Sequence, residues 1–196
     1  MQHIFGRESL MEDIQSKIKL STEEIGIFNT LWKERKLVKN EYIFRNGEVC
    51  KFDSFVISGS FKAFYIHPDT GKEEIIFFAI ENWWATDLDS FSNQSPSMYA
   101  IQAIENSIVL QVNYPSFEEL LRRIPKLERY FRLILQGYNS SIQRRIILTN
   151  SHSAEERYRD FVQRYPKIIQ KVPQYLIASY LGMTPEFLSK IRGKKN

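Results

Sequence analysis

Three turn signals, each centred on a glycine, divide the region after residue 40 into short segments. Gly47, Gly59 and Gly71 lie twelve residues apart. The segments between them are rich in β-branched and aromatic residues that alternate with a period of two, which is typical of strands joined by tight turns rather than of strand–helix–strand units. We therefore predict a compact antiparallel roll or sandwich, with strands at 41–45, 55–58, 61–66, 73–79, 99–103 and 107–112 and a hairpin loop at 67–72.

Helical periodicity replaces this alternation on both sides of the roll. Ser21 and Glu24 have the spacing of a capping box and predict a short amphipathic helix from residue 21 to residue 33. Between about 127 and 149, apolar residues recur every three or four positions, which predicts a long helix. Its apolar stripe packs either on the roll or, as we expect, on the same helix of a second copy; the candidate dimer contacts are Leu127, Phe131, Ile134, Tyr138, Ile142 and Ile146.

The segment 172–192 reads as helix, glycine turn, helix. Gly182 permits the left-handed backbone that reverses the chain, Thr184 is a natural N-cap, and Pro185 is tolerated at the first helical position. This pattern is typical of a helix-turn-helix whose second helix enters the DNA major groove, although an αα-hairpin without a DNA role has the same pattern. The candidate DNA contacts are Gln174, Thr184, Pro185, Glu186, Ser189, Lys190, Arg192, Lys194 and Lys195.

Two of these residues have specific expected roles. Lys190 is the first candidate for a base-edge or phosphate contact, and Glu186 is placed to accept from a cytosine amino group.

Positive charge is concentrated at the C-terminal end of the chain. The net charge is +4, and residues 151–196 contain nine Lys or Arg against four Asp or Glu, so the whole excess lies there. This asymmetry is expected of a polyanion-binding module joined to a neutral one, because basic residues at phosphates release condensed counterions. A solvated charged tail is the alternative explanation.

Several function classes lack the residues they require. Cys50 is the single cysteine, so no disulfide forms within the chain and no cysteine cluster is available for iron–sulfur or zinc. His3, His67 and His152 share no metal-ligand spacing, and we find no nucleophile–base pattern or glycine-rich phosphate loop. We therefore expect no catalytic residues, no metal and no enzyme activity. Without a leader-like N-terminus or an apolar run of about 20 residues, we expect a cytoplasmic protein that does not enter the membrane.

Several motifs, in order along nearly the whole chain, resemble the Crp/Fnr family of bacterial regulators. They are the segments 41–48, 55–62, 153–158, 165–166 and 172–174. The resemblance implies an α+β architecture: an N-terminal antiparallel β-roll sensor of the cyclic-nucleotide-binding type (1–120), a long dimerisation helix (121–150) and a small α-helical helix-turn-helix domain (151–196). It also implies a transcription regulator that works as a homodimer on double-stranded DNA with a two-fold symmetric operator, and that contacts RNA polymerase.

The sequence departs from the family at the phosphate cassette. Members that bind cyclic AMP carry a Gly-Glu pair and, about ten residues on, an Arg-Ser pair whose guanidinium holds the phosphate. Here Asp87 stands near the glutamate position, Pro96 replaces the arginine and Ser97 is retained. Without the bidentate cation, we do not expect cyclic AMP to bind in the usual way. The pocket takes another, unidentified small-molecule effector or none, and its candidate residues are Trp83, Trp84, Thr86, Asp87, Ser97 and Tyr99.

A second departure lies beyond the helix-turn-helix. The family usually continues into a β-hairpin wing, whereas only five residues follow Ile191 in this sequence, so fewer phosphate contacts are expected. We interpret the chain as a DNA-binding transcription regulator. The alternative is a small-molecule sensor that acts through protein contacts and carries a degenerate DNA-binding domain.

Overall fold

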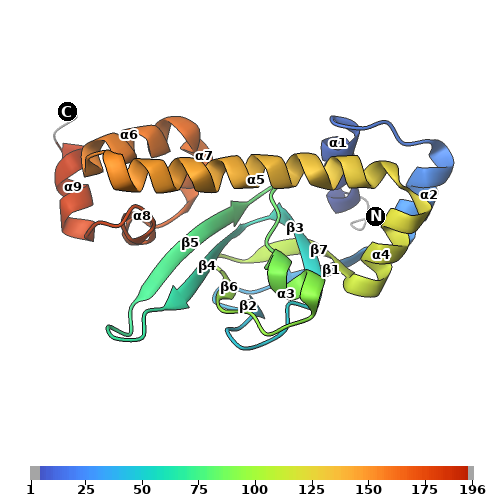
Figure 1. The fold of residues 1–196 in the computed structure, drawn as a ribbon, viewed down its shortest axis with the longest axis horizontal. Coiled ribbons are helices and arrows are strands. Elements are labelled where there is room, and N and C mark those ends of the chain that lie inside the picture. Colours follow the sequence, from blue (N-terminus) through green and yellow to red (C-terminus); the bar gives the residue numbers. More distant parts are fainter. Residues whose placement is uncertain (1–4, 194–196) are drawn as a thin grey trace.

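The chain folds as an antiparallel β-roll beneath one long helix, with smaller helices at both ends of that helix (Figure 1). The computed structural model describes residues 5–193. The strands form two sheets with the orders β1-β7-β3 and β2-β6-β4-β5, and every pair of neighbouring strands is antiparallel. Their bounds are β1 Lys33–Leu37, β2 Tyr42–Phe44, β3 Phe52–Ser58, β4 Ser60–Ile66, β5 Glu73–Ile80, β6 Ala100–Ala103 and β7 Ser107–Asn113.

The predicted roll is confirmed, and its interior lies between the two sheets. Side chains from both sheets, including Val56, Phe61, Ile101 and Val109, form this core and are almost fully buried. The turn between β3 and β4 passes so close to β7 that a Cβ at Gly59 would lie 2.8 Å from the Cα of Ser107. With φ at +92°, this position requires glycine both for its backbone conformation and for the space it leaves.

The helices divide into two groups along the molecule. Figure 1 shows α1, α2 and α4 at one end of α5 and α6 to α9 at the other. Their bounds are α1 Phe5–Gln15, α2 Thr22–Thr30, α3 Leu88–Asn93, α4 Tyr114–Arg123, α5 Lys126–Ser151, α6 Ala154–Arg164, α7 Pro166–Lys171, α8 Gln174–Tyr180 and α9 Pro185–Gly193.

The beginning of α5 is held by the N-terminal helices. Leu127 and Tyr130 of α5 are fully buried in a cluster with Leu10 and Ile14 of α1 and Phe28 of α2. The Tyr130 hydroxyl also donates to the Asp13 carboxylate at 2.6 Å, which fixes α1 against α5.

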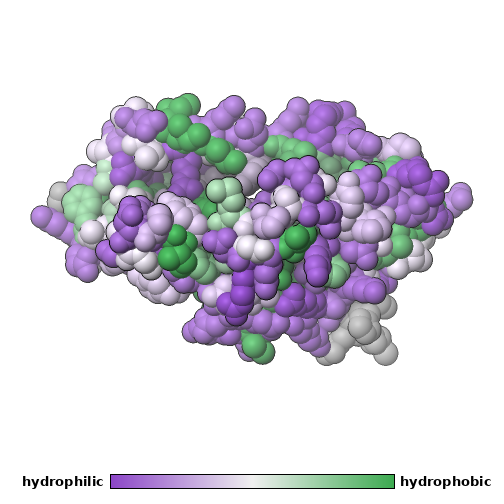
Figure 2. All heavy atoms as spheres, turned by 60° about the horizontal axis from the view of Figure 1, so that its bottom comes forward, coloured by the Kyte–Doolittle hydropathy of each residue, from purple (hydrophilic) through white to green (hydrophobic). Residues whose placement is uncertain are grey.

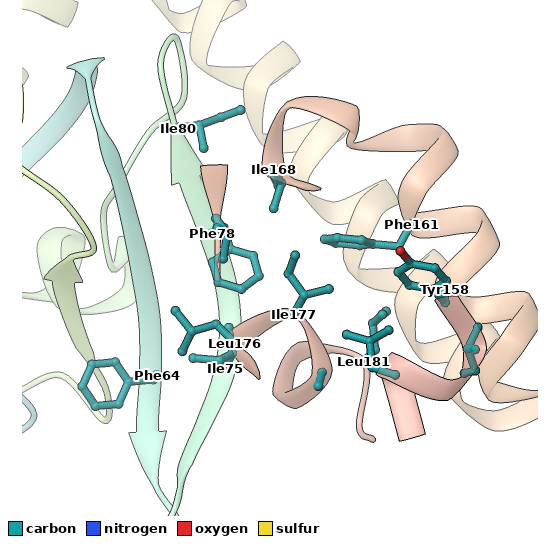
Figure 3. Packing of buried hydrophobic residues seen from close by; sticks show 14 of the residues in the cluster. Phe64, Ile75, Phe78, Ile80, Tyr158, Phe161, Ile168, Leu176, Ile177 and Leu181 are labelled. Carbon is teal, nitrogen blue, oxygen red and sulfur yellow. The ribbon is translucent and has the colours of Figure 1, made fainter. Parts of the chain in front are cut away.

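The C-terminal helices pack directly on the outer face of the second sheet. In Figure 3, Ile75 and Phe78 of β5 face Leu176 and Ile177 of α8, and Phe161 of α6 lies beyond them. These residues belong to one buried cluster, so the roll and the C-terminal helices share a hydrophobic core rather than sitting apart. Burial of this shared apolar surface stabilises the observed orientation of the helices.

Several sequence predictions of local structure need correction. The helix expected over 21–33 ends at Thr30, although its Ser21–Glu24 capping box is present, and residues 33–37 form β1 because they pair along their whole length with β7. Tertiary pairing here overrides the helical pattern. Helices α1 and α4 were not predicted. Helix α3, whose N-cap is Asp87, was not predicted either.

Candidate nucleic-acid interface and sensor cassette

The turn between α8 and α9 has the predicted geometry. Gly182 adopts a φ of +66°, and the Met183 amide donates to the Ala178 carbonyl at 3.0 Å, which closes the end of α8. Thr184 Oγ1 accepts from the Phe187 amide at 3.2 Å and so caps the start of α9. Ile177, Ala178 and Leu181 of the first helix and Leu188 and Ile191 of the second are buried together, as the sequence pattern requires. The two helices therefore form one rigid unit.

The outer face of α9 is free in this chain. Its predicted contact residues with exposed side chains are Pro185, Glu186, Ser189, Lys190 and Arg192, and Thr184 is exposed at its start. The position of Glu186 at the helix N-terminus, where its backbone and Thr184 donate hydrogen bonds, lowers the pKa of its carboxyl below the usual range. α9 thus presents one anionic and two cationic side chains to solvent within a single short helix.

Three predicted DNA contacts are not among the exposed side chains described above, and two exposed aromatic residues of α8 and α9 were not predicted. Gln174 is only partly exposed, and its Oε1 is buried without a hydrogen-bond donor among the described residues. Lys194 and Lys195 lie outside the described residues. Tyr175 of α8 and Phe187 of α9 are 58% and 44% exposed. Both are apolar residues off the buried stripe of their helices, which is the sequence signal that would have found them.

Asp87 and Ser97, the two polar residues at the positions of the family's phosphate cassette, hydrogen-bond to each other. Asp87 Oδ1 accepts from the Asp89 and Ser90 amides at 3.2 and 3.3 Å, at the N-terminus of α3. Asp87 Oδ2 accepts from the Ser97 hydroxyl at 2.5 Å. Asp87 and Ser97 are 7% and 3% exposed. The carboxylate of the chain itself therefore occupies the helix N-terminus and the hydroxyl that an external anion would use.

Thr86 belongs to a second buried network, next to the first. Its hydroxyl donates to the Asp53 carboxylate and accepts from the Ser54 amide at 3.1 Å. The Ser54 hydroxyl in turn accepts from the Gln111 amide group at 2.9 Å. Burial raises the pKa of Asp53 to about 7, and the Thr86 hydrogen bond opposes this shift. Thr86 is thus a structural residue of the roll interior.

The three aromatic candidates have three different roles. Trp84 is partly buried against the core: it packs on Phe55 and on Tyr130, and its Nε1 donates to the Tyr130 hydroxyl at 3.3 Å. Trp83 is 37% exposed and packs edge-on against Tyr165, at the start of α7. Tyr99 stacks edge-on with Phe77, which does the same with Tyr138 of α5. The six candidate ligand residues therefore do not line one common pocket.

The residues proposed for dimerisation divide into a buried and an exposed group. Leu127 is fully buried in this chain, and Phe131 and Ile134 are partly buried against the same cluster, so Leu127 has no surface left for a second copy. Farther along α5, Tyr138, Ile142 and Ile146 are 40%, 38% and 55% exposed. Leu135, which was not predicted, is 46% exposed. Figure 2 shows one face of the molecule, on which hydrophobic side chains form separate patches in a mainly hydrophilic surface.

One arginine connects the long helix, the sheet and the helix-turn-helix. Arg145 of α5 donates at 3.0 Å to the carbonyls of Ile75 and Tyr180, and its guanidinium stacks over the Tyr180 ring at 4.1 Å. Ser179 of α8 accepts from the Ile75 amide at 3.3 Å and so covers the edge of β5. On the other side, Glu81 forms an ion pair with Lys171 of α7. The orientation of α8 and α9 is therefore set by specific polar contacts as well as by the shared core.

Comparison with known proteins assigns this architecture. A family model described as a cyclic nucleotide-binding domain matches residues 34–124. Regulatory protein HlyX of Actinobacillus pleuropneumoniae is 25% identical over 187 residues, covering 89% of this chain and 77% of the relative. The fumarate and nitrate reduction regulatory protein of Yersinia pestis is 26% identical over 180 residues, covering 85% and 70%. The structure of FixK2 from Bradyrhizobium japonicum superimposes with a TM-score of 0.73 at 19% identity, covering 84% of both chains.

The chain is similar to the Crp/Fnr family of regulators over most of its length. Its relatives are regulatory proteins and not enzymes. The roll, α5 and the C-terminal helices match the fold of Crp/Fnr-like structures. Within residues 5–193 no group of three or more His, Cys, Asp or Glu side chains is placed to hold a metal ion. No helix in the same range is long and apolar enough to cross a membrane.

Proposed function

We propose that this Crp/Fnr-like protein is a DNA-binding transcription regulator that reads a two-fold symmetric site with α9. The observation that carries the proposal is the exposed polar face of α9, with Glu186, Ser189 and Lys190 directed to solvent while Leu188 and Ile191 anchor the helix. In a helix-turn-helix the second helix has this arrangement when its exposed face lies in the major groove. Lys190 contacts a guanine edge or a phosphate, and Glu186, which stays ionised, accepts from a cytosine amino group.

The selection of DNA fragments by the purified protein tests this proposal. We expect several rounds of mobility-shift selection to enrich a two-fold symmetric site whose half-sites lie about one turn, or about 34 Å, apart. Lys190→Ala should weaken binding to that site by about 5- to 100-fold, the value of one base-edge contact. The matched control is Lys167→Ala, because Lys167 is an exposed lysine on α7, outside the helix-turn-helix. Enrichment of no site would overturn the DNA proposal and favour a sensor that acts through protein contacts.

We propose further that the protein is a homodimer joined through α5. The support is the apolar row Leu135, Tyr138, Ile142 and Ile146, whose spacings of three and four residues suit a two-stranded coiled coil. The domain division follows from this proposal: a sensor at 1–120, a dimerisation helix at 121–150 and a DNA-binding part at 151–196. In this arrangement the first turns of α5, with Leu127, serve the fold of one chain, and only the later turns meet the partner.

Two exposed isoleucines of α5, Ile142 and Ile147, provide a matched test of the dimer. Ile142 and Ile147 are both exposed, but five residues at about 100° each place them about 140° apart around α5. We expect Ile142→Asp to convert the dimer to a monomer in sedimentation equilibrium and Ile147→Asp to leave it intact. Equal effects of the two changes would contradict a coiled coil through this face.

The cassette supports a sensor that does not bind cyclic AMP in the usual way. Asp87 and Ser97 already satisfy each other, and Asp87 also caps α3. No arginine is among the groups that hydrogen-bond to this carboxylate within the described chain. A cyclic phosphate at this place would meet a buried carboxylate and no guanidinium, which is electrostatically unfavourable. In this proposal the cytoplasmic protein responds to a different small molecule or to no ligand in this domain. We also propose that the DNA-bound protein contacts RNA polymerase.

A further inference from the structure

A small crevice rich in arginine lies where α5 meets the C-terminal helices. It has a volume of about 40 Å³ and is lined by residues of α5, α6 and α8. Its charged lining residues are Arg144, Arg145, Arg157, Arg164 and Asp160. We call this site the hinge crevice. Since a cavity needs only roughly 10–15 Å³ to hold one water molecule, the hinge crevice has room for a small polyatomic group.

The single carboxylate does not neutralise the four guanidinium groups. Asp160 takes Arg144 as an ion-pair partner, and Arg164 Nε lies 3.7 Å from Asp160 Oδ2. Arg145 is bound to backbone carbonyls, and Arg157 Nη1 donates to the His152 carbonyl at 3.0 Å. These carbonyls are neutral, so the lining keeps three uncompensated positive charges around a space about the size of an oxyanion.

One arginine that lines the hinge crevice has a donor without an acceptor. The Nε of Arg157 is buried and lacks a hydrogen-bond partner among the described residues. Leaving a buried charged donor unpaired is costly, and arginine is the side chain best suited to bind phosphate groups through paired N–H donors. The hydroxyl groups of Ser141, Thr149 and Tyr165 also line the crevice. The chemistry of this lining is that of a phosphate site.

The hinge crevice lies beside the proposed dimer contacts and not on them. Arg144 lies two residues after Ile142, about 160° away around α5, whereas Arg145 lines both the crevice and the neighbouring hollow next to Ile142. None of the cassette residues lines the crevice. Asp160 and the arginines come from both the long helix and α6, so an anion bound between them joins the sensor side to the DNA-binding side.

We propose that the hinge crevice binds a phosphate-type oxyanion, and that the occupied crevice fixes the angle between α5 and α6. This inference goes beyond the proposed function, because anion binding is measurable without DNA. Two sources share the chemistry: a free phosphorylated small molecule, and a phosphate of the DNA backbone. Asp160 holds two of the arginines in the free protein and competes with the anion for them.

The first experiment uses inorganic phosphate as the probe. Phosphate is titrated against the full chain at constant ionic strength in chloride, and the melting temperature and the dissociation constant are measured. We expect saturable stabilisation of the wild type and binding about 5- to 10-fold weaker in Arg164→Gln. The matched control is Arg132→Gln, because Arg132 is an exposed arginine of α5 whose side chain bonds only to Gln136 in the described chain.

A second variant protects the test against loss of folding. Asp160→Asn removes the competing carboxylate, so we expect phosphate to bind several-fold tighter, an outcome that general destabilisation does not produce. Phosphate binding that is absent, or identical in Arg164→Gln, Asp160→Asn and Arg132→Gln, would overturn the free-anion source.

The second experiment distinguishes the DNA backbone from a free anion. The slope of log K against log salt is measured for a duplex of random sequence. If a DNA phosphate occupies the crevice, Arg164→Gln lowers this slope by about one, and inorganic phosphate competes with the duplex. If the occupant is a free anion, the salt slope of Arg164→Gln equals that of Arg132→Gln, while inorganic phosphate still binds to the wild type. An unchanged slope together with no saturable phosphate binding would refute the proposal altogether.

Discussion

Helices α3 and α9 are both short, polar and capped by a side chain at the N-terminus. The polar groups at the start of α3 are buried, whereas those of α9 are exposed. In the cassette, Asp87 and Ser97 are buried and bonded to each other. On α9, Glu186, Ser189 and Lys190 are exposed, and the carboxyl of Glu186 has only the hydrogen bonds of its own helix N-terminus, from its backbone and from Thr184. Buried polar pairs contribute to stability, whereas exposed unpartnered ones contribute little and remain available for a ligand. The cassette is thus structural, and α9 is the helix that we propose to be functional.

The largest expected loss of stability comes from Trp84, and the adjacent Trp83 serves as its control. Trp84→Ala removes a ring packed against Phe55, Tyr130 and Phe131, and should lower the free energy of unfolding by about 3–5 kcal/mol. Trp83→Ala is the matched control: its ring is partly exposed and packs mainly on Tyr165, so about 1 kcal/mol is expected. Urea denaturation measures both. Similar losses would contradict the closer packing of Trp84 against the core cluster.

The second effect compares one carboxylate from each region. Asp87→Ala leaves the Ser97 hydroxyl and the first amides of α3 without their acceptor, and should cost about 2–3 kcal/mol of unfolding free energy. Glu186→Ala changes an exposed side chain, and its effect on stability should stay within about 0.5 kcal/mol. A stability loss for Glu186→Ala as large as that for Asp87→Ala would contradict the contrast between the two helices.

The third effect is a pH dependence that originates in the roll. The pKa of Asp53 is raised to about 7 in the folded chain from 3.8, so between these values the folded state binds the extra proton. Stability from this group is therefore present at low pH and is lost as the pH rises through 7, by about 2–3 kcal/mol between pH 5 and pH 8. Asp53→Asn should flatten this dependence and be more stable than the wild type at pH 8. Parallel profiles of the two proteins would show that Asp53 does not cause it.

A smaller effect concerns the link between the two regions. Lys171→Gln removes the ion pair with Glu81, whose pKa this contact lowers despite the opposing effect of burial. Since both side chains are partly exposed, the loss should be at most about 1 kcal/mol. Faster hydrogen exchange at the α7–β5 contact with little change in melting temperature is the expected signature. A cost of several kcal/mol would instead mean that this pair is the main interdomain connection.

The sequence was sufficient for the parts of the molecule whose pattern is local. The roll, the long helix and the helix-turn-helix follow from alternation, an apolar stripe, and the Gly182 and Thr184 signals, because turn and cap chemistry acts within a few residues. β1 was missed because its five residues are specified by pairing with β7, which is distant in sequence. The helices α1 and α4 also depend on contacts with the roll and with α5.

The candidate sites show the same limit. Exposure on α9 could be predicted from its amphipathic pattern. Trp83, Trp84 and Thr86 were assigned to one pocket because they lie in the stretch that resembles the family's phosphate cassette. In the structure Trp83 packs on Tyr165, Trp84 packs on Phe55 at the core, and Thr86 donates to Asp53. The hinge crevice was not foreseen, since its arginines come from two helices and become a cluster only when those helices pack.

The most direct test of this contrast is to measure binding of the selected DNA duplex with and without cyclic AMP, together with calorimetric titration of the nucleotide. We predict the same dissociation constant for DNA in both conditions and no saturable heat for cyclic AMP, because the Asp87–Ser97 pair fills the cassette. DNA binding tightened tenfold or more by cyclic AMP, with a saturable heat, would show that the cassette opens to the nucleotide and would contradict the account.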